Sequence, residues 1–354
     1  MASRRLQRLR ARLAELNLDA MLITQAENRR YLSGFTGSAG VLIIGHEKQV
    51  LATDSRYWGQ MAREAPLFEL AQIKGKTEPT VLETLKALGA RRVGFESGQV
   101  TVAQLEGWQK EFAAIELVPT QNVVESLRAV KDAQEIEVMR RASVLTDQAF
   151  DFLMDTIRPG MTEKQLAWDV EVFLRTHGAE GLAFEVHIAS GPNSAEPHHP
   201  PTDRAVQEGE PIWIDMGARM DGYCSDLTRS FVIGKPDDQF KRIYNIVLQA
   251  QMDTERAMRA GLPGKEADAV ARRVIEEAGF AENFGHGLGH GLGLAVHEKP
   301  SAGRLSDDTL MEGGVVTVEP GIYIPGWGGV RIEDVVIIEQ GRAQVMTQAH
   351  KPQY

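Results

Sequence analysis

Five residues in the second half of the chain have the types and spacing of a metal site. They are four carboxylates and one imidazole, all in glycine-punctuated, β-rich sequence: Asp215, Asp226, His290, Glu319 and Glu333. Hard divalent cations prefer oxygen ligands, and four carboxylates carry more negative charge than one cation needs. Two cations sharing these ligands would neutralise that charge, and paired sites of this kind do hydrolysis by activating a water between the metals. The residues therefore predict a dinuclear metallohydrolase.

The first acidic pair is predicted to lie on one β-hairpin. Asp215 and Asp226 stand in strand-like runs, and Asp221-Gly222 between them is a strong hairpin signal. A turn centred between Met220 and Asp221 would place the aspartates opposite each other. A turn centred on Asp221-Gly222 would pair Asp215 with Thr228 and leave Asp226 diagonal to it. Either register puts the carboxylates roughly 5–8 Å apart on one sheet face. A three-residue loop would put them on opposite faces, as unrelated surface residues.

A second acidic pair has the same arrangement. Glu319 and Glu333 are equidistant from Gly326, which lies in the turn-like segment Pro325–Gly329. Each glutamate interrupts an otherwise apolar strand, where an unpaired charge is costly to bury. Either one alone is equally well read as a solvated residue at a strand end. Two hairpins that each carry an inward acidic pair predict a shared site.

The imidazole comes from a glycine-rich segment, Phe284–Gly293, which holds His286 and His290. This is not a zinc-protease HExxH helix, because five glycines disfavour a helix and no Glu follows His286. Glycine at alternate positions instead predicts a strand whose backbone is closely approached by substrate or metal. With four carboxylates elsewhere, His290 is predicted to be a ligand, and His286 and His297 to line the site.

Composition excludes several other functions. The net charge of −10 argues against nucleic acid or an anionic membrane as partner, because no basic excess exists to release counterions. Covalent catalysis has no good candidate, since Gly-x-Ser-x-Gly is absent and Cys224, the only cysteine, has the apolar neighbours of a core thiol. No apolar signal region and no membrane-spanning run are apparent, so a cytoplasmic location is expected.

The order of predicted elements indicates two domains. The first third alternates helices and strands, which predicts a small α/β domain over residues 1–126, with helices near 3–17, 80–88 and 102–114 and strands near 20–24, 41–44, 49–52, 92–95 and 116–118. Residues 127–354 form the second domain, with helices expected at 133–154, 162–176, 238–260 and 265–278 and strands and glycine turns elsewhere. Thr162 is expected to cap its helix with Gln165 as the capping-box partner.

In these residues the chain resembles the pita-bread metallopeptidases, which include methionine aminopeptidase, aminopeptidase P and prolidase. The matching motifs are IDMGARMDGYCSDLTRSF, GHGLGHGLGLAVHE, TVEPGIYIPG and GVRIEDVV, while NRRYLSGFTGSAG and TDSRYWGQ resemble the extra N-terminal domain of the proline-directed branch. The resemblance implies an α+β fold, with a pita-bread catalytic domain preceded by a smaller α/β creatinase-type domain. It also implies an Xaa-Pro aminopeptidase or Xaa-Pro dipeptidase, with a homodimer as the expected assembly.

Motif by motif, the resemblance implies a role for each site residue. Asp215 would chelate one metal, Asp226 and Glu333 would bridge two, and His290 and Glu319 would complete the set. Glu319 would also act as general base. The resemblance further implies a catalytic role for four flanking residues: His198 contacting the substrate, His297 steadying the oxyanion or passing a proton to the leaving nitrogen, His286 lining the pocket, and Arg331 bracing Asp215. One histidine among four carboxylates suits Mn²⁺, with Co²⁺ or Zn²⁺ also able to bind.

The choice between aminopeptidase and dipeptidase depends on one position. Many prolidases have an Arg directly after the HExP segment, where it receives the dipeptide carboxylate, whereas this chain has Ser301 there. Arg304, Arg29 or Arg30 are possible substitutes. Without a carboxylate clamp, peptides can extend past proline, so small peptides with proline at the second position are the expected substrates and aminopeptidase P activity is favoured. Prolidase activity is the alternative, and an inactive pita-bread binding protein is a remote one, because such relatives lose metal ligands.

Overall fold

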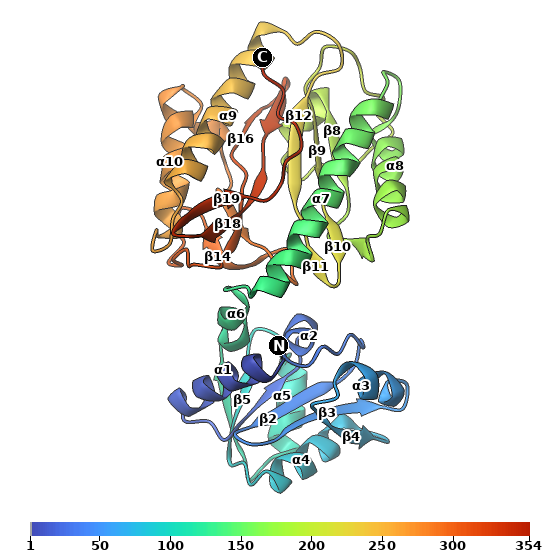
Figure 1. Cartoon of the computed structure of the whole chain (residues 1–354), viewed down its shortest axis with the longest axis vertical. Coiled ribbons are helices and arrows are strands. Elements are labelled where there is room, and N and C mark those ends of the chain that lie inside the picture. The colour runs from blue at the N-terminus through green and yellow to red at the C-terminus, as the bar shows by residue number, and fades with distance from the viewer. Residues whose placement is uncertain (1) are drawn as a thin grey trace. The chain divides into compact units, whose positions relative to one another are not determined.

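The computed structural model describes residues 2–354, which fall into two compact units (Figure 1). The first unit ends at Arg128 and the second begins at Ala129. This division lies two residues from the predicted boundary after residue 126.

The first unit is an α/β domain built on one six-stranded sheet of order β4-β3-β2-β1-β5-β6. Its strands are β1 (Ala20–Ile23), β2 (Val41–Gly45), β3 (Gln49–Asp54), β4 (Glu69–Ile73), β5 (Arg92–Glu96) and β6 (Glu116–Thr120). Its helices are α1 (Ala2–Glu15), α2 (Ala26–Ser33), α3 (Trp58–Glu64), α4 (Thr77–Ala87), α5 (Val102–Glu111) and α6 (Val123–Arg128). The five predicted strands and three predicted helices are all present.

The core of this unit explains which elements were recognisable. Strands β1 and β2 are buried at every position, and Trp108 of α5 packs edge-on against Phe95 of β5. Burial on both faces leaves continuous apolar runs, which the sequence shows clearly. Strand β4 lies at the sheet edge, and its Glu69 and Gln72 are exposed. It therefore lacks an apolar pattern and was not predicted, and nor were the short helices α2, α3 and α6.

The second unit contains four long helices, α7 (Ala133–Thr156), α8 (Glu163–Thr176), α9 (Asp238–Ala257) and α10 (Gly264–Glu277), with short 3₁₀ turns at Gly191–Ala195 and Ala281–Asn283. All four long helices match predicted ranges. Thr162 caps α8 by accepting a bond from the Gln165 amide, as expected. The full capping box occurs instead at α7, between Asp132 and Glu135. None of the helices within residues 2–354 combines the length and apolar character needed to cross a membrane.

The strands of this unit lie between the two helix pairs (Figure 1). They form sheets of order β12-β9-β8, β11-β10-β7, β14-β13-β15-β18-β19 and β16-β17. Their bounds are β7 (Gly181–Leu182), β8 (His187–Ser190), β9 (Ile212–Met216), β10 (Ala218–Met220), β11 (Tyr223–Cys224), β12 (Leu227–Phe231), β13 (Gly289–Gly291), β14 (Glu298–Ala302), β15 (Val315–Val318), β16 (Gly321–Ile324), β17 (Gly328–Arg331), β18 (Asp334–Glu339) and β19 (Arg342–Val345). One apolar core joins α7 and α8 to β8, β9 and β12, and another joins α9 and α10 to β15 and β18. Helices α7 and α8 therefore pack against one group of strands, and helices α9 and α10 pack against the other.

Candidate metal centre

The first hairpin follows one of the two registers left open by the sequence. Asp215 of β9 pairs with Thr228 of β12, and Arg219 pairs with Cys224, so the turn is centred on Asp221-Gly222. Both turn residues have positive φ, at 46° and 82°, as a two-residue hairpin turn of this type requires. Asp226 lies just before β12 and is buried. The diagonal arrangement is therefore the one that the chain adopts.

The second hairpin is centred on Gly326, as the spacing predicted. Gly321 pairs with Arg331 on one side of a break and Val318 pairs with Asp334 on the other. The break falls at the two glutamates. The amide of Glu319 donates to Leu288 O at 2.9 Å, and the amide of Glu333 donates to Thr228 O at 3.0 Å. Neither glutamate pairs within its own hairpin. Glu333 instead joins the second hairpin to the first, and Glu319 joins it to the histidine-bearing segment 284–293.

His290 stands on β13, between two neighbouring strands. A Cβ at Gly289 would lie 2.2 Å from Thr317 O, and one at Gly291 would lie 2.3 Å from the Lys299 backbone. The alternate glycines therefore do permit close approach, but the approaching groups are the chain's own strands. The predicted approach by substrate or metal does not explain these glycines.

The protonation of His290 follows from its hydrogen bond. Its Nδ1 lies 3.1 Å from Gly291 O, and a carbonyl only accepts, so Nδ1 carries the proton. Burial lowers the pKa of His290, which keeps the ring neutral. The lone pair on Nε2 therefore points at carboxylate oxygens, 3.3 Å from Glu319 Oε1 and 3.8 Å from Asp226 Oδ2. When the carboxylates are ionised, all of these atoms are acceptors, which is the arrangement that a cation satisfies.

The same conclusion follows from the carboxylates. Ligand atoms of Asp226, His290 and Glu333 all lie within 4.8 Å of one another. Asp215 Oδ2 is held by Arg331 at 2.7 Å, while its buried Oδ1 has no hydrogen-bond partner within residues 2–354. A buried carboxylate oxygen left without a donor is unfavourable unless something else compensates it. The residues present therefore fit divalent metal ions.

Burial and mutual repulsion raise the pKa values of three of the acidic groups. The pKa of Asp226 is raised well above its usual value by burial and then by the charges of Glu333, Asp215 and Glu319. Burial, followed by the charges of Glu319 and Asp215, likewise raises the pKa of Glu333. Burial raises the pKa of Glu319 to about 7. Asp226 thus interacts with all three other carboxylates, a central position in the cluster.

All nine residues predicted for the site line one cavity of about 600 Å³. The five candidate ligands form part of its wall, and the other four predicted residues, His198, His286, His297 and Arg331, also line it. The ring centre of His297 is 4.2 Å from that of His290. Burial and the Arg331 charge lower the pKa of His286 to about 4, so this ring is neutral near pH 7. Its Nε2 lies 3.1 Å from the Tyr323 hydroxyl.

Arg331 connects most of this wall. Its guanidinium donates to Asp215, to the Tyr323 hydroxyl at 3.0 Å and to Pro197 O at 3.0 Å, and its Nε donates to Thr228 Oγ1 at 3.0 Å. Having accepted that bond, the Thr228 hydroxyl donates to Glu333 Oε2 at 2.7 Å. The proposed brace on Asp215 is therefore one branch of a network that also orients a second carboxylate.

Four supporting residues were missed by the sequence analysis: Thr228, Thr317, Tyr323 and His187. Thr317 Oγ1 accepts from the His290 amide at 3.0 Å and donates to Glu319 Oε1 at 3.1 Å. The hairpin arithmetic contained a signal for Thr228, because one of its registers placed that residue opposite Asp215. The hairpin centred on Gly326 likewise places Tyr323 diagonally across from Arg331. The contact of His187 with His199 O follows from no such spacing rule.

Family models match both parts of the chain. The model for metallopeptidase family M24 matches residues 137–340, and the model for the creatinase/prolidase N-terminal domain matches residues 5–130. The chain belongs to metallopeptidase family M24. The expected fold, a pita-bread catalytic domain preceded by a creatinase-type domain, is confirmed.

Individual M24 relatives align over almost the whole chain. An Xaa-Pro dipeptidase from Pyrococcus furiosus is 35% identical over 98% of both chains. The solved structure of an Xaa-Pro dipeptidase from Bacillus anthracis is 40% identical, with a TM-score of 0.96 over 99% of both chains. The structure of an X-Pro aminopeptidase from Thermotoga maritima is 38% identical, with a TM-score of 0.89 over 97% of this chain and 99% of that one. The protein is therefore a metallopeptidase.

The raised carboxylate pKa values predict that Mn²⁺ stabilises this M24 enzyme more at pH 8 than at pH 6. The pKa of glutamate in an unfolded chain is about 4.3, whereas burial raises the pKa of Glu319 in the metal-free fold to about 7. A raised folded pKa contributes stability that is present below the unfolded value and is lost as pH rises through the folded value. The metal-free protein should thus lose stability as the pH rises from about 4.3 to about 7, with the last part of the loss above pH 6, while a bound cation removes the repulsion.

The measurement is the melting temperature of EDTA-treated and Mn²⁺-loaded protein at both pH values. The gap between the two preparations should widen at pH 8. Calorimetric titration should also show proton release on metal binding. A gap that stays constant with pH would contradict the coupling between these carboxylates and the metal.

Proposed function

We propose that the protein hydrolyses the peptide bond that precedes proline in Xaa-Pro dipeptides. The observation that carries this choice is the full-length similarity to the Bacillus anthracis Xaa-Pro dipeptidase, at 40% identity. The Pyrococcus furiosus relative bears the same description. The sequence alone favoured aminopeptidase P activity, but these similarities support the dipeptidase alternative better.

Two divalent metal ions are proposed as the cofactor, Mn²⁺ first, with Co²⁺ or Zn²⁺ able to use the same ligands. The proposed ligands are Asp215, Asp226, His290, Glu319 and Glu333. Bound together, the ions would lower the pKa of a water shared between them and so generate the nucleophile. Asp226 and Glu333 are proposed to bridge, in keeping with the position of Asp226 among the other carboxylates.

Glu319 is the proposed general base. In the metal-free protein burial raises its pKa to about 7, so it can take up a proton near neutral pH. Thr317 donates to one of its oxygens and so orients the carboxylate. The other oxygen is left to receive the proton of the attacking water.

The histidines of the cavity wall are proposed to act on the substrate. A prolyl leaving group has no amide hydrogen, so its nitrogen must gain a proton as the bond breaks. His297 lies beside His290, and His198 is exposed in the same wall. We assign His297 to the oxyanion or the leaving nitrogen and His198 to the substrate near the scissile carbonyl.

A dipeptide substrate needs a cation for its carboxylate. Ser301 lines the cavity at the position where many prolidases have Arg. Arg304 lies in an adjoining pocket that shares His286, Gly287, Ser301 and Gly303 with the cavity. Arg29 is buried within the first unit, where it donates to Thr24 O and Gly37 O. Arg30 stands on α2 of the same unit and is not among the residues that line either pocket. Arg304 is therefore the proposed carboxylate partner.

Aminopeptidase P activity remains the second candidate. Ser301 favours it, because a cavity without an adjacent arginine leaves room for peptides that extend past proline. The Thermotoga maritima X-Pro aminopeptidase, at 38% identity, supports it as well.

Matched substrates distinguish the two activities. An Xaa-Pro dipeptide should have a kcat/KM about 10–100-fold higher than an Xaa-Pro-Xaa tripeptide with the same first two residues, because a charge-assisted hydrogen bond to the carboxylate contributes about 1.5–3 kcal/mol. Both rates are measured with and without added Mn²⁺. A higher kcat/KM for the tripeptide would replace the dipeptidase proposal with the aminopeptidase one. Hydrolysis of neither peptide would reject both.

A further inference from the structure

His198 is carried by a segment with little regular structure. Residues 190–202 run from the end of β8 through a 3₁₀ turn and then without helix or strand. Backbone of this kind has no ladder of its own to hold a side chain in place, so its position depends on other contacts. The contacts that hold this segment therefore decide where His198 stands.

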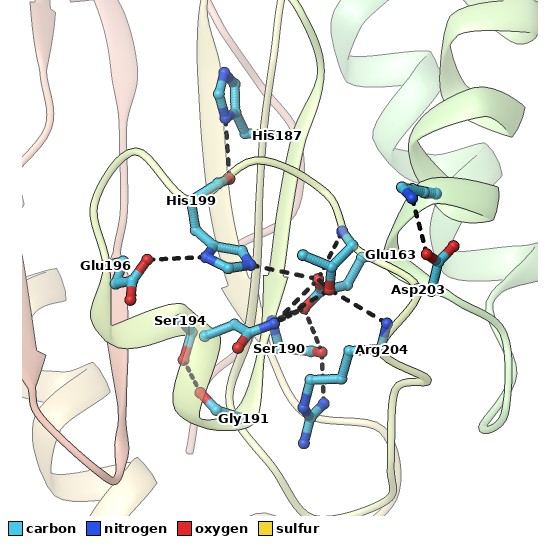
Figure 2. Close-up of polar contacts among 12 residues, drawn as sticks. Glu163, His187, Ser190, Gly191, Ser194, Glu196, His199, Asp203 and Arg204 are labelled. Carbon is cyan, nitrogen blue, oxygen red and sulfur yellow. Dashed lines mark hydrogen bonds and ion pairs between the residues drawn. The ribbon is translucent and has the colours of Figure 1, made fainter.

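Glu163 contacts both ends of this segment (Figure 2). It is the first residue of α8 and its side chain is fully buried. One oxygen accepts from the Ser190 amide at 2.8 Å and the Ser190 hydroxyl at 2.7 Å. The other accepts from the Thr202 amide at 3.1 Å and the Thr202 hydroxyl at 2.6 Å. The Asn193 side-chain amide lies 3.2 Å from both. One carboxylate thus joins the two ends of the segment.

The neighbours of His198 are held from the cavity side. Arg331 donates to Pro197 O at 3.0 Å, and His187 Nδ1 lies 3.1 Å from His199 O. Both Arg331 and His187 line the catalytic cavity. Glu163 therefore holds the two ends of the segment, while Arg331 and His187 hold the residues directly before and after His198.

We propose that Glu163 is a positioning residue, which fixes the segment 190–202 and through it sets His198 against the substrate. This inference rests on the proposed role of His198. Capping of α8 does not account for Glu163, because Thr162 performs it. The groups that Glu163 bonds are donors, and the Ser190 hydroxyl in turn accepts from Arg204 at 2.7 Å. An acceptor-only carboxylate matches this environment, whereas an amide would place its NH₂ against other donors.

A double-mutant cycle tests the proposal. Glu163→Gln should lower kcat/KM by about 10–100-fold, the range seen when residues supporting a site are removed. In the His198→Ala background the same change should have less than about a twofold further effect, since Glu163 acts through His198. Combined with His297→Ala, by contrast, it should keep its full effect. Full additivity with His198→Ala would overturn the proposal, because a general structural defect would not depend on which histidine remains.

Two further variants distinguish a specific effect on kcat/KM from an effect of misfolding. Thr202→Val removes one donor to Glu163 at nearly constant volume, and it replaces Glu163→Gln in the cycle if the latter does not fold. Asp203→Asn is the matched control, since Asp203 is exposed beside the same segment (Figure 2) and forms a surface ion pair with Lys164 at 2.9 Å. It should leave kcat/KM unchanged. Metal content and melting temperature are measured for every variant.

The cycle also separates this inference from the proposed function. If His198→Ala alone keeps wild-type kcat/KM, the role proposed for His198 is wrong and the inference falls with it. If His198→Ala is impaired and the effect of Glu163→Gln is additive, only the positioning role of Glu163 is rejected.

Discussion

Asp226→Asn is expected to lower kcat/KM by ~10³-fold or more, equivalent to about 4 kcal/mol of transition-state stabilisation. An amide offers a neutral ligand in place of a charged one. Asp226 interacts with Glu333, Asp215 and Glu319, so its loss should weaken the binding of both metal ions. Metal stoichiometry and peptide hydrolysis in excess Mn²⁺ measure the two effects. A variant that retained half the activity would refute the bridging role.

The same variant should be more stable to unfolding than the wild type in the metal-free state, although its activity is lower. In metal-free protein at pH 8 burial and the neighbouring charges disfavour the ionised form of Asp226, which the unfolded chain carries freely, and Asn removes that cost of folding. Relief of roughly 1 kcal/mol would raise the melting temperature by about 2–4 °C. Asp221→Asn is the matched control, because Asp221 lies in the turn of the same hairpin at a positive φ that asparagine tolerates. It should change neither metal binding nor activity.

Glu319→Gln is expected to lower kcat by about 10²–10⁴-fold, the usual contribution of a general base. The amide oxygen can still accept the Thr317 hydrogen bond, so the local geometry should persist. The amide cannot take a proton from the attacking water. KM should therefore change by less than about threefold, which would show that a group acting mainly in the transition state was removed.

Metal content must accompany that measurement, because Glu319 is also a proposed ligand. Glu339→Gln provides the control, since Glu339 ends β18 of the same long hairpin but is about half-exposed and forms a 3.4 Å surface pair with Arg140. A Glu319→Gln variant with full metal content and a kcat within tenfold of wild type would assign the base to another residue.

The hairpins show how much of the site could be predicted from local sequence. Gly326 was identified correctly as the centre of the second hairpin, because turn residues and apolar runs are local signals. The register of the first hairpin remained open between two turn positions. It is decided by the backbone of Asp221 and Gly222, whose positive φ values close a two-residue turn.

The break in the second hairpin could not be predicted in the same way. Glu319 and Glu333 leave their ladder because Leu288 and Thr228 offer backbone carbonyls from other segments of the chain. Those partners lie far along the chain, and no spacing rule indicates them. The alternate glycines near His290 are a local pattern that the sequence shows directly. The groups that approach them belong to neighbouring strands, so only the folded structure identifies those groups.

By itself the sequence determined the chemistry of this protein: the acidic residues, the histidine, and the hairpins and helices that carry them. These follow from residue type and periodicity, which act over a few residues. The tertiary structure alone decided how that chemistry is supported. Arg331 reaches Asp215 across 116 positions of the chain, and Glu163 reaches Thr202 across 39. Such contacts form only after distant elements pack, because the energy that selects them comes from burial and hydrogen bonding in the finished fold.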